Sequence, residues 1–204
     1  MVQTESWPLA RNHGVKLRES GMPDEMYWES LFDVELILDR LGIDSRLRDV
    51  VELGCGYGTF AIPVARLISG VLRTYDIDPA MVERTCSRVR EAGLDNVMCS
   101  VRDVFLNGFG LERDSNDACL LFNILHGEEP VSLLKEAGRV IRPAGLVLVI
   151  HWRCDIETPR GPNPDIRPRP SQVIEWAAEA DLMTQNEPVI NLPPWHYGVR
   201  LRKR

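Results

Sequence analysis

Three glycines at alternate positions, placed directly after a short apolar run, constrain the fold of this chain most strongly. Residues 49–53 have the composition of a buried strand, and Gly54, Gly56 and Gly58 follow it at once. Glycine weakens a strand, so this spacing indicates a backbone that turns sharply and lets a ligand approach closely. Residues 60–68 then have a helix-like pattern. Such a strand, loop and helix predict a nucleotide-like ligand at the carboxyl end of a parallel sheet.

Strand-like and helix-like segments alternate beyond this loop, and the alternation predicts an α/β fold. The predicted strands cover residues 49–53, 71–75, 97–101, 117–122 and 146–151, and the predicted helices cover residues 60–68, 79–92 and 130–140. A pattern of this kind forms a single, doubly wound, mostly parallel sheet with helices on both faces. Two further strands, over residues 182–192 and 195–202, predict a C-terminal antiparallel hairpin and a total of seven strands.

The remaining segments are patterned differently. Residues 1 to about 25 form a polar arm, and apolar residues at helical spacing then run from Asp24 to a stop at Gly42. We therefore divide the chain into an N-terminal arm with a helical cap (1–45) and a ligand-binding domain (46–204) that form one structural unit. Five prolines between residues 158 and 170 exclude regular structure there. A helix is expected to follow, with Ser171 as its N-cap.

Composition and charge narrow the function classes. With 204 residues the chain is long enough for one domain with a sizeable core. Its net charge of −6 does not supply the basic field that nucleic-acid binding needs. The five cysteines include no CxxC pair, which argues against a disulfide framework or a zinc site and favours reduced thiols in the cytoplasm. The longest apolar run, residues 146–150, is too short to cross a bilayer. We expect a cytoplasmic protein without a metal, a nucleic-acid partner or a membrane anchor, and the oligomeric state stays open.

The motifs, in this order, resemble those of the class I, Rossmann-like S-adenosylmethionine-dependent methyltransferases. The glycine loop, with Glu52 before it, matches the family signature E-x-G-x-G-x-G, and the resemblance extends over roughly residues 49–150. The turn at residues 142–145 stands where the family has K/R-P-G-G, with Ala144 in place of the first glycine. The resemblance implies that residues 46–204 form a methyltransferase domain. It also implies S-adenosylmethionine as cofactor and in-line transfer of its methyl group to a small or medium-sized acceptor.

The resemblance also assigns the cofactor contacts. Asp76 matches the ribose-binding position and Asp103 the adenine contact. A carboxylate about twenty residues beyond the glycine loop suits the first role, because it accepts two hydroxyl donors at once. Cys55 is interpreted as a small filler rather than a nucleophile. The aromatic face of Tyr27 would attract the sulfonium. The predicted cofactor contacts are Glu52, Gly54, Cys55, Gly56, Gly58, Asp76, Ile77, Asp103, Val104, Asn123 and Tyr27.

A second group of residues is predicted on the acceptor side. His126 follows the fourth predicted strand, where the family lines its reaction centre, and it is the first candidate for a general base if the acceptor must lose a proton. Arg160 would bind a carboxylate or a phosphate on the acceptor. The predicted substrate contacts are Trp28, His151, Trp152 and Arg160.

Two alternatives remain open at the level of the sequence. An NAD(P)-dependent Rossmann oxidoreductase shares the first half of the fold, although Thr59 occupies the last glycine position of its G-x-G-x-x-G motif. A non-catalytic subunit that binds S-adenosylmethionine and serves a partner is the other alternative.

Overall fold

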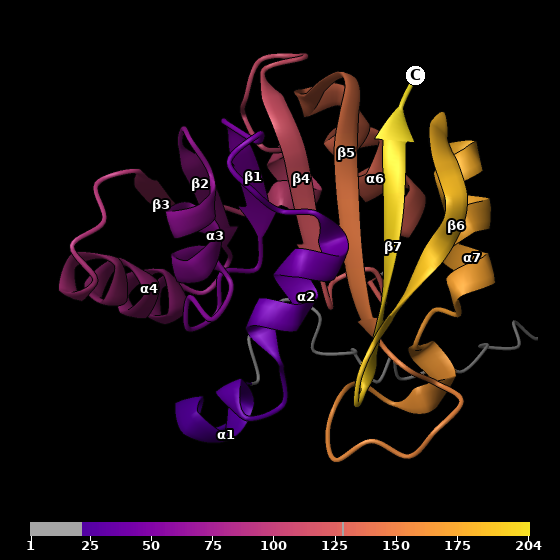
Figure 1. Cartoon of the computed structure of the whole chain (residues 1–204), viewed down its shortest axis with the longest axis horizontal. Coiled ribbons are helices and arrows are strands. Elements are labelled where there is room, and N and C mark those ends of the chain that lie inside the picture. Colours follow the sequence, from indigo (N-terminus) through magenta and orange to yellow (C-terminus); the bar gives the residue numbers. More distant parts are fainter. Residues whose placement is uncertain (1–21, 128) are drawn as a thin grey trace, which may run out of the picture.

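One seven-stranded sheet organises the part of the chain that the structure describes (Figure 1). The computed structural model describes residues 22–127 and 129–204, so residues 1–21 of the predicted arm lie outside the described residues. The strands follow the spatial order β3-β2-β1-β4-β5-β7-β6. Their bounds are β1 Val50–Leu53, β2 Leu72–Asp76, β3 Val97–Val101, β4 Asn116–Phe122, β5 Ile141–Trp152, β6 Leu182–Leu192 and β7 His196–Lys203.

The direction of the strands confirms the predicted fold class. Strands β1 to β5 run parallel to one another, and β7 is antiparallel to both β5 and β6. The chain therefore folds as a mostly parallel, doubly wound α/β sheet that closes with an antiparallel hairpin. Parallel strands need crossover connections, and the helices supply them.

Helices cover both faces of this sheet. In Figure 1, α2 crosses in front of the strands and α6 lies behind them. Leu38 of α2 and Val64 of α3 belong to one apolar cluster, whereas Leu134 of α6 and Val173 of α7 belong to the other. The helix bounds are α1 Glu25–Glu29, α2 Val34–Leu41, α3 Ala61–Leu67, α4 Pro79–Glu91, α5 Val104–Asn107, α6 Pro130–Val140 and α7 Pro170–Glu179, with the 3-10 helix η1 at Pro164–Ile166.

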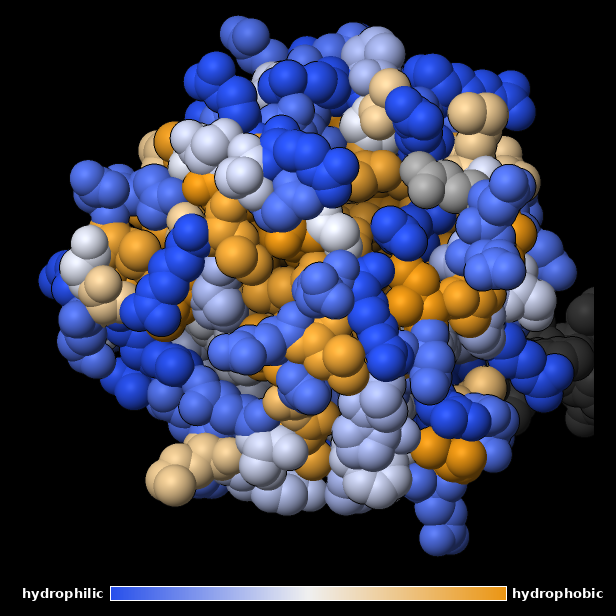
Figure 2. All heavy atoms as spheres, viewed as in Figure 1, coloured by the Kyte–Doolittle hydropathy of each residue, from blue (hydrophilic) through white to orange (hydrophobic). Residues whose placement is uncertain are grey.

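Burial on both faces explains why residues 146–150 of β5 are continuously apolar. Successive residues of β5 alternate between the two clusters: Leu148 packs on the side of α2 and α3, and Val149 on the side of α6 and α7. The outer surface is different in character. Figure 2 shows mainly polar side chains on the viewed face, with apolar ones between them. Among the described residues, no helix is both long and apolar enough to cross a membrane.

The N-terminal cap differs from the single helical run that the sequence predicts. It consists of two helices, because an aspartate starts each of them. The Asp24 carboxylate accepts a hydrogen bond from the Tyr27 backbone N–H (3.2 Å), and the Asp33 carboxylate accepts one from the Leu36 N–H (3.1 Å). Both are N-caps, which separate the two helices. Gly42, at φ +73°, ends α2 as expected.

Two other boundaries also differ from the prediction. Strand β5 begins at Ile141, so the predicted turn at residues 142–145 is an irregular start of the strand, with Ala144 in the left-handed region at φ +64°. Helix α7 starts at Pro170 with Arg169 as its N-cap, so the assignment of Ser171 as N-cap was wrong. The reason is that proline is favourable at the first helical position, so the helix begins one residue before Ser171. The Pro-rich segment also contains the short helix η1.

Candidate active site

A cavity of about 610 Å³ opens at the carboxyl ends of the parallel strands. Residues that follow β1, β2, β3 and β4 line it, together with the end of β5 and part of the loop beyond. This is the edge at which open α/β sheets bind ligands, and the volume suits a small molecule. Twelve of the predicted site residues line the cavity: Trp28, Gly54, Cys55, Gly56, Asp76, Ile77, Asp103, Val104, Asn123, His126, Trp152 and Arg160.

The glycine loop forms the floor beside β1. Gly54, Gly56 and Gly58 have φ angles of +87°, +49° and +78°, a region that costs other residues energy. A Cβ on Gly56 would lie 3.2 Å from the Met22 side chain, and one on Gly58 would lie 3.2 Å from the Thr85 side chain. The loop therefore needs glycine for its shape. Gly58 itself faces Thr85 and does not line the cavity.

Asp76 ties this loop to the end of β2. Its carboxylate accepts one hydrogen bond from the Gly56 N–H and one from the Asp78 N–H, both at 3.0 Å. Burial raises the pKa of Asp76 above its ordinary value, although the backbone hydrogen bonds oppose this. Each carboxylate oxygen retains acceptor capacity toward the cavity, so the group can take two hydroxyl donors. Asp78 caps α4 through the Ala80 N–H (2.9 Å), which leaves Asp76 for the ligand.

Glu52 and Cys55 are buried groups whose pKa values are raised. Glu52 is buried, does not line the cavity and accepts a hydrogen bond from the Thr74 hydroxyl at 2.6 Å. Burial raises the pKa of Glu52 to about 8. The same cause raises the pKa of the Cys55 thiol, so it stays protonated at neutral pH. Thiols of this kind are poor nucleophiles.

The ends of β3 and β4 supply polar groups to the cavity. The Asp103 carboxylate accepts a hydrogen bond from the Leu106 N–H (3.1 Å), which starts the short helix α5. Asn123 lies in the left-handed region at φ +56°, and its side-chain oxygen is buried without a hydrogen-bond partner among the described residues. The hydroxyl oxygen of Thr59 is likewise buried without a hydrogen-bond partner among the described residues. A buried oxygen without a partner costs free energy, so a bound ligand would find two unused polar groups here.

Sequence reasoning missed several lining residues. In the sequence, Thr59 is notable only as a departure from a glycine motif. The burial of its hydroxyl is evident only from the fold. The long apolar side chains in this group are equally typical of a core, so composition carries no signal for them. The lining residues that were not predicted include Met22, Thr59, Phe60, Arg102, Phe105, Phe122, Ile124, Asn163 and Ile166.

His126 and His151 contact each other at the acceptor side of the cavity. Nδ1 of His126 lies 3.2 Å from Nε2 of His151. Only His126 lines the cavity, because His151 is fully buried behind it on β5. Burial lowers the pKa of His126, and burial with the neighbouring His126 lowers the pKa of His151 to about 3. Both imidazoles are therefore neutral at pH 7, and His151 can reach a substrate only through His126.

Trp28 and Trp152 form an aromatic wall of the same cavity. Their rings lie 6.5 Å apart in an edge-to-face arrangement. Tyr27, next in the chain to Trp28, is 42% exposed and does not line the cavity. Its hydroxyl donates instead to the Pro159 carbonyl at 3.3 Å, and so it joins α1 to the loop beyond β5.

Ion pairs, together with the packing of Trp28, hold α1 over the cavity. No residue of α1 is buried. Glu25 accepts two hydrogen bonds from Arg84 of α4, at 2.7 and 2.9 Å. Arg88 pairs with Glu29 at 2.5 Å and with Glu25 at 3.1 Å. The four charges form a network that fastens the cap to α4.

We expect the double variant Arg84→Gln/Arg88→Gln to release S-adenosylhomocysteine several-fold faster than the unchanged protein. Exposed ion pairs weaken with salt, so release from the unchanged protein should also accelerate at high ionic strength. Stopped-flow displacement measures the rate. Arg46→Gln is the matched control, because Arg46 pairs with Asp44 at an exposed site away from the cap. Equal release rates in the double variant and the control would contradict a role for the network.

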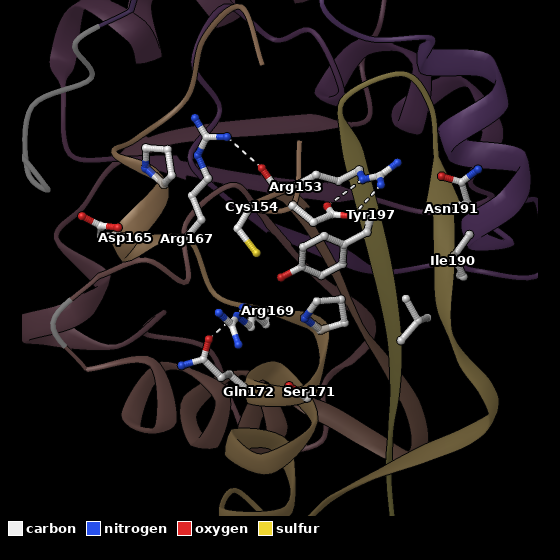
Figure 3. A pocket seen from close by; sticks show the side chains of 14 residues that line it. Arg153, Cys154, Asp165, Arg167, Arg169, Ser171, Gln172, Ile190, Asn191 and Tyr197 are labelled. Carbon is white, nitrogen blue, oxygen red and sulfur yellow. Dashed lines mark hydrogen bonds and ion pairs between the residues drawn. The ribbon is translucent and has the colours of Figure 1, made fainter. Parts of the chain in front are cut away.

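A second hollow, of about 1140 Å³, lies between the loop after β5, the start of α7 and the C-terminal hairpin. Several of its polar groups already bond within the protein (Figure 3). Arg167 donates to the Arg153 carbonyl at 2.7 Å, and the Tyr197 hydroxyl donates to the Pro168 carbonyl at 2.6 Å. Arg153 also pairs with Asp155 at 2.6 Å. The cavity at the strand ends, with its unpartnered oxygens, is therefore the better candidate.

Comparisons with known proteins agree with this geometry. A family model described as "Methyltransferase domain" matches residues 50–145. A search of curated protein sequences found no match. Among solved structures, the fold is similar to a SAM-dependent methyltransferase from Aquifex aeolicus, with a TM-score of 0.77, 23% identity, and coverage of 89% of this chain and 94% of that one.

Two further structures extend the comparison. One is the N-methyltransferase NodS from Bradyrhizobium japonicum WM9 in complex with S-adenosyl-L-homocysteine, with a TM-score of 0.69, 15% identity, and coverage of 91% of this chain and 95% of that one. The other is a geranyl diphosphate methyltransferase in complex with GPP and sinefungin, with a TM-score of 0.68, 16% identity, and coverage of 84% and 78%. At these identities, the three likenesses establish a shared fold.

Fold, strand-end cavity and glycine loop together define a nucleotide-binding α/β enzyme of the methyltransferase type. The match of the family model over residues 50–145, with the shared fold, supports a class I, Rossmann-like S-adenosylmethionine-dependent methyltransferase. Its cofactor is S-adenosylmethionine, and its reaction is methyl transfer. These findings favour the methyltransferase over the oxidoreductase that the sequence left open.

Proposed function

We propose that the methyl acceptor is a small molecule that binds between the cofactor and the aromatic wall of the cavity. The observation that carries this proposal is the division of the cavity. Asp76 and the glycine loop lie at the ends of β1 and β2, whereas His126 and Trp152 lie at the ends of β4 and β5. A cofactor held on the first side leaves the second side for an acceptor of limited size.

The chain's own residues have distinct roles in this proposal. Asp76 accepts hydrogen bonds from the ribose hydroxyls, and Asp103 accepts one from the adenine amine. The glycine loop lets the methionine part approach the backbone. Trp28 and Arg160 line the far wall, where an aromatic face and a guanidinium suit a flat acceptor with an anionic group.

The chemistry is an in-line displacement. The lone pair of the acceptor atom forms a bond to the methyl carbon, and the carbon–sulfur bond breaks with its electrons passing to sulfur. The cofactor already carries the leaving group, so the protein mainly aligns the two partners at about 3–3.5 Å. His126 takes the proton of the acceptor, because a neutral imidazole at the cavity wall is a suitable general base.

The cysteines and the net charge support the proposed location and acceptor class. Five free cysteines support a cytoplasmic location, and the net charge of −6 supports an acceptor other than nucleic acid. We propose residues 1–45 as arm and cap, and residues 46–204 as the domain that carries the site.

The test is an acceptor screen with S-adenosylmethionine labelled in its methyl group. Phenols, amines, thiols and carboxylic acids are incubated with the full chain, and label in the small-molecule fraction is counted. We expect transfer to one of these classes, and none with the Asp76→Ala variant. Label that appeared only in added oligonucleotides or proteins would overturn the proposal of a small acceptor.

A further inference from the structure

We propose that His151 is a positioning residue: it holds His126 in the tautomer whose Nε2 is unprotonated and thereby adapts the site to an acceptor that must lose a proton. This inference rests on the proposed role of His126 and deepens it. The acceptor class it names is a small molecule whose attacking atom is the oxygen of a hydroxyl or the nitrogen of an N–H group.

The contacts of His151 fix where its own proton lies. Nδ1 of His151 is 3.4 Å from the carbonyl oxygen of Trp152, and Nε2 is 3.2 Å from Nδ1 of His126. A carbonyl oxygen only accepts hydrogen bonds. The proton of His151 therefore belongs on Nδ1, where it has an acceptor. In the other tautomer, a lone pair of His151 would face the Trp152 oxygen.

This arrangement determines the tautomer of His126. With Nδ1–H on His151, its Nε2 offers a lone pair, and the contact with His126 is a hydrogen bond only if Nδ1 of His126 carries the proton. Nε2 of His126 is then unprotonated. The nearly perpendicular rings, 79° apart with centroids at 5.3 Å, place the His151 nitrogen opposite the edge of the His126 ring. Among the described residues, no hydrogen bond to Nε2 of His126 is found, so its lone pair is available to a ligand.

The surroundings keep both rings neutral. His151 is fully buried in β5, in register with Tyr197 of β7, whose ring centroid is 6.4 Å away. The charged forms of His126, His196 and Arg167 would all repel a cationic His151. Beside His126, Asp165 and Arg167 line a small hollow toward α7. Each neutral imidazole thus carries one ring proton, and that of His126 lies in the contact between the two rings.

The proton count then balances for the proposed acceptors. As the acceptor atom bonds to the methyl carbon, its proton passes to Nε2 of His126, and the carbon–sulfur electrons pass to sulfur. The resulting imidazolium still donates from Nδ1 to the lone pair of His151, which stabilises the cation without a further transfer. A tertiary amine or a thioether carries no such proton and gains nothing from this arrangement.

Nitrogen-15 NMR of the histidine-labelled full chain, saturated with S-adenosylhomocysteine, tests the inference without an acceptor. The variant His126→Asn assigns the signals. In the unchanged protein we expect protonated Nδ1 and unprotonated Nε2 for both His126 and His151. A protonated Nε2 on His126 would overturn the inference, while methyl transfer itself would be untouched.

Two substitutions separate positioning from packing. His151→Gln keeps an oxygen that accepts from Nδ1 of His126, and His151→Leu has none. We expect His126 to retain the Nδ1–H tautomer in the glutamine variant and to change to Nε2–H in the leucine variant. Persistence of Nδ1–H in the leucine variant would also overturn the inference. If the leucine variant does not fold, the tautomer in the unchanged protein decides alone.

Kinetics give an independent readout once the screen has supplied an acceptor. We expect kcat to fall roughly 10²-fold in His151→Leu, to recover in His151→Gln, and to leave the affinity for S-adenosylhomocysteine unchanged in both. Equal losses in the two variants would mean that His151 only packs. Failure of the unchanged protein to bind S-adenosylhomocysteine would instead count against the assignment of the cofactor.

Discussion

Replacement of Asp76 by alanine is expected to weaken cofactor binding by orders of magnitude while the protein remains folded. The Asp76 carboxylate lies on the cavity and accepts hydrogen bonds from the Gly56 and Asp78 N–H groups. In the complex it would also accept two ribose hydroxyls, and hydrogen bonds to a charged group contribute about 1.5–3 kcal/mol each. The loss should therefore lower the affinity for S-adenosylhomocysteine by about 10²–10⁴-fold, measured by isothermal titration calorimetry.

Stability should change much less than affinity in this variant. Burial raises the pKa of Asp76, so the folded state already holds this carboxylate at some cost. Its removal leaves two backbone donors at the edge of a solvent-accessible cavity, where water can replace the lost acceptor. Urea unfolding measures the change in the free energy of unfolding. Asp44→Ala is the matched control, because Asp44 pairs with Arg46 at an exposed site away from the cavity. Unchanged affinity in Asp76→Ala would refute the ribose assignment.

The sequence predicts the fold well where the pattern of apolar residues agrees with the residues that start or end a helix or strand. Strand β3 at Val97–Val101, helix α6 at Pro130–Val140 and strand β6 at Leu182–Leu192 have the predicted bounds. The break between α1 and α2 was not predicted, because helical spacing of apolar residues continues across it. Only the capping role of Asp33 marks the new start, and an aspartate in a helical pattern is ambiguous without the structure.

The site residues are also predictable only in part from the sequence. Residues that come directly after parallel strands, such as Gly54, Asp76, Asp103 and Asn123, all line one cavity, because these strand ends meet at one edge of the sheet. The direction of single side chains was not accessible in this way. Tyr27 and Trp28 are neighbours on one helical turn, so they point in directions about 100° apart, and only Trp28 lines the cavity. The burial of His151 likewise depends on how β7 and the loop beyond β5 pack against it.

Replacement of His126 by alanine is expected to lower kcat by about 10²–10⁴-fold without a change in cofactor affinity. His126 is the imidazole on the cavity wall, and its contact with His151 directs Nε2 to the ligand. The acceptor found in the screen serves as substrate. Added imidazole should restore part of the rate, because the alanine variant leaves space for a small external base. A kcat close to that of the unchanged protein would show that the acceptor needs no base.

The pH dependence of kcat gives a second test of His126 as the general base. Burial lowers the pKa of His126 below the ordinary value of 6.5, so the folded protein keeps this imidazole neutral at pH 7 and for some distance below pH 6.5. Only the neutral form accepts a proton, so kcat should fall as pH decreases through this lowered pKa. The acid limb should therefore have its midpoint below 6.5. It should vanish in His126→Ala, where no imidazole titrates. An acid limb that survived in this variant would assign the titration to another group, with Asp76, whose pKa burial raises, as the first to examine.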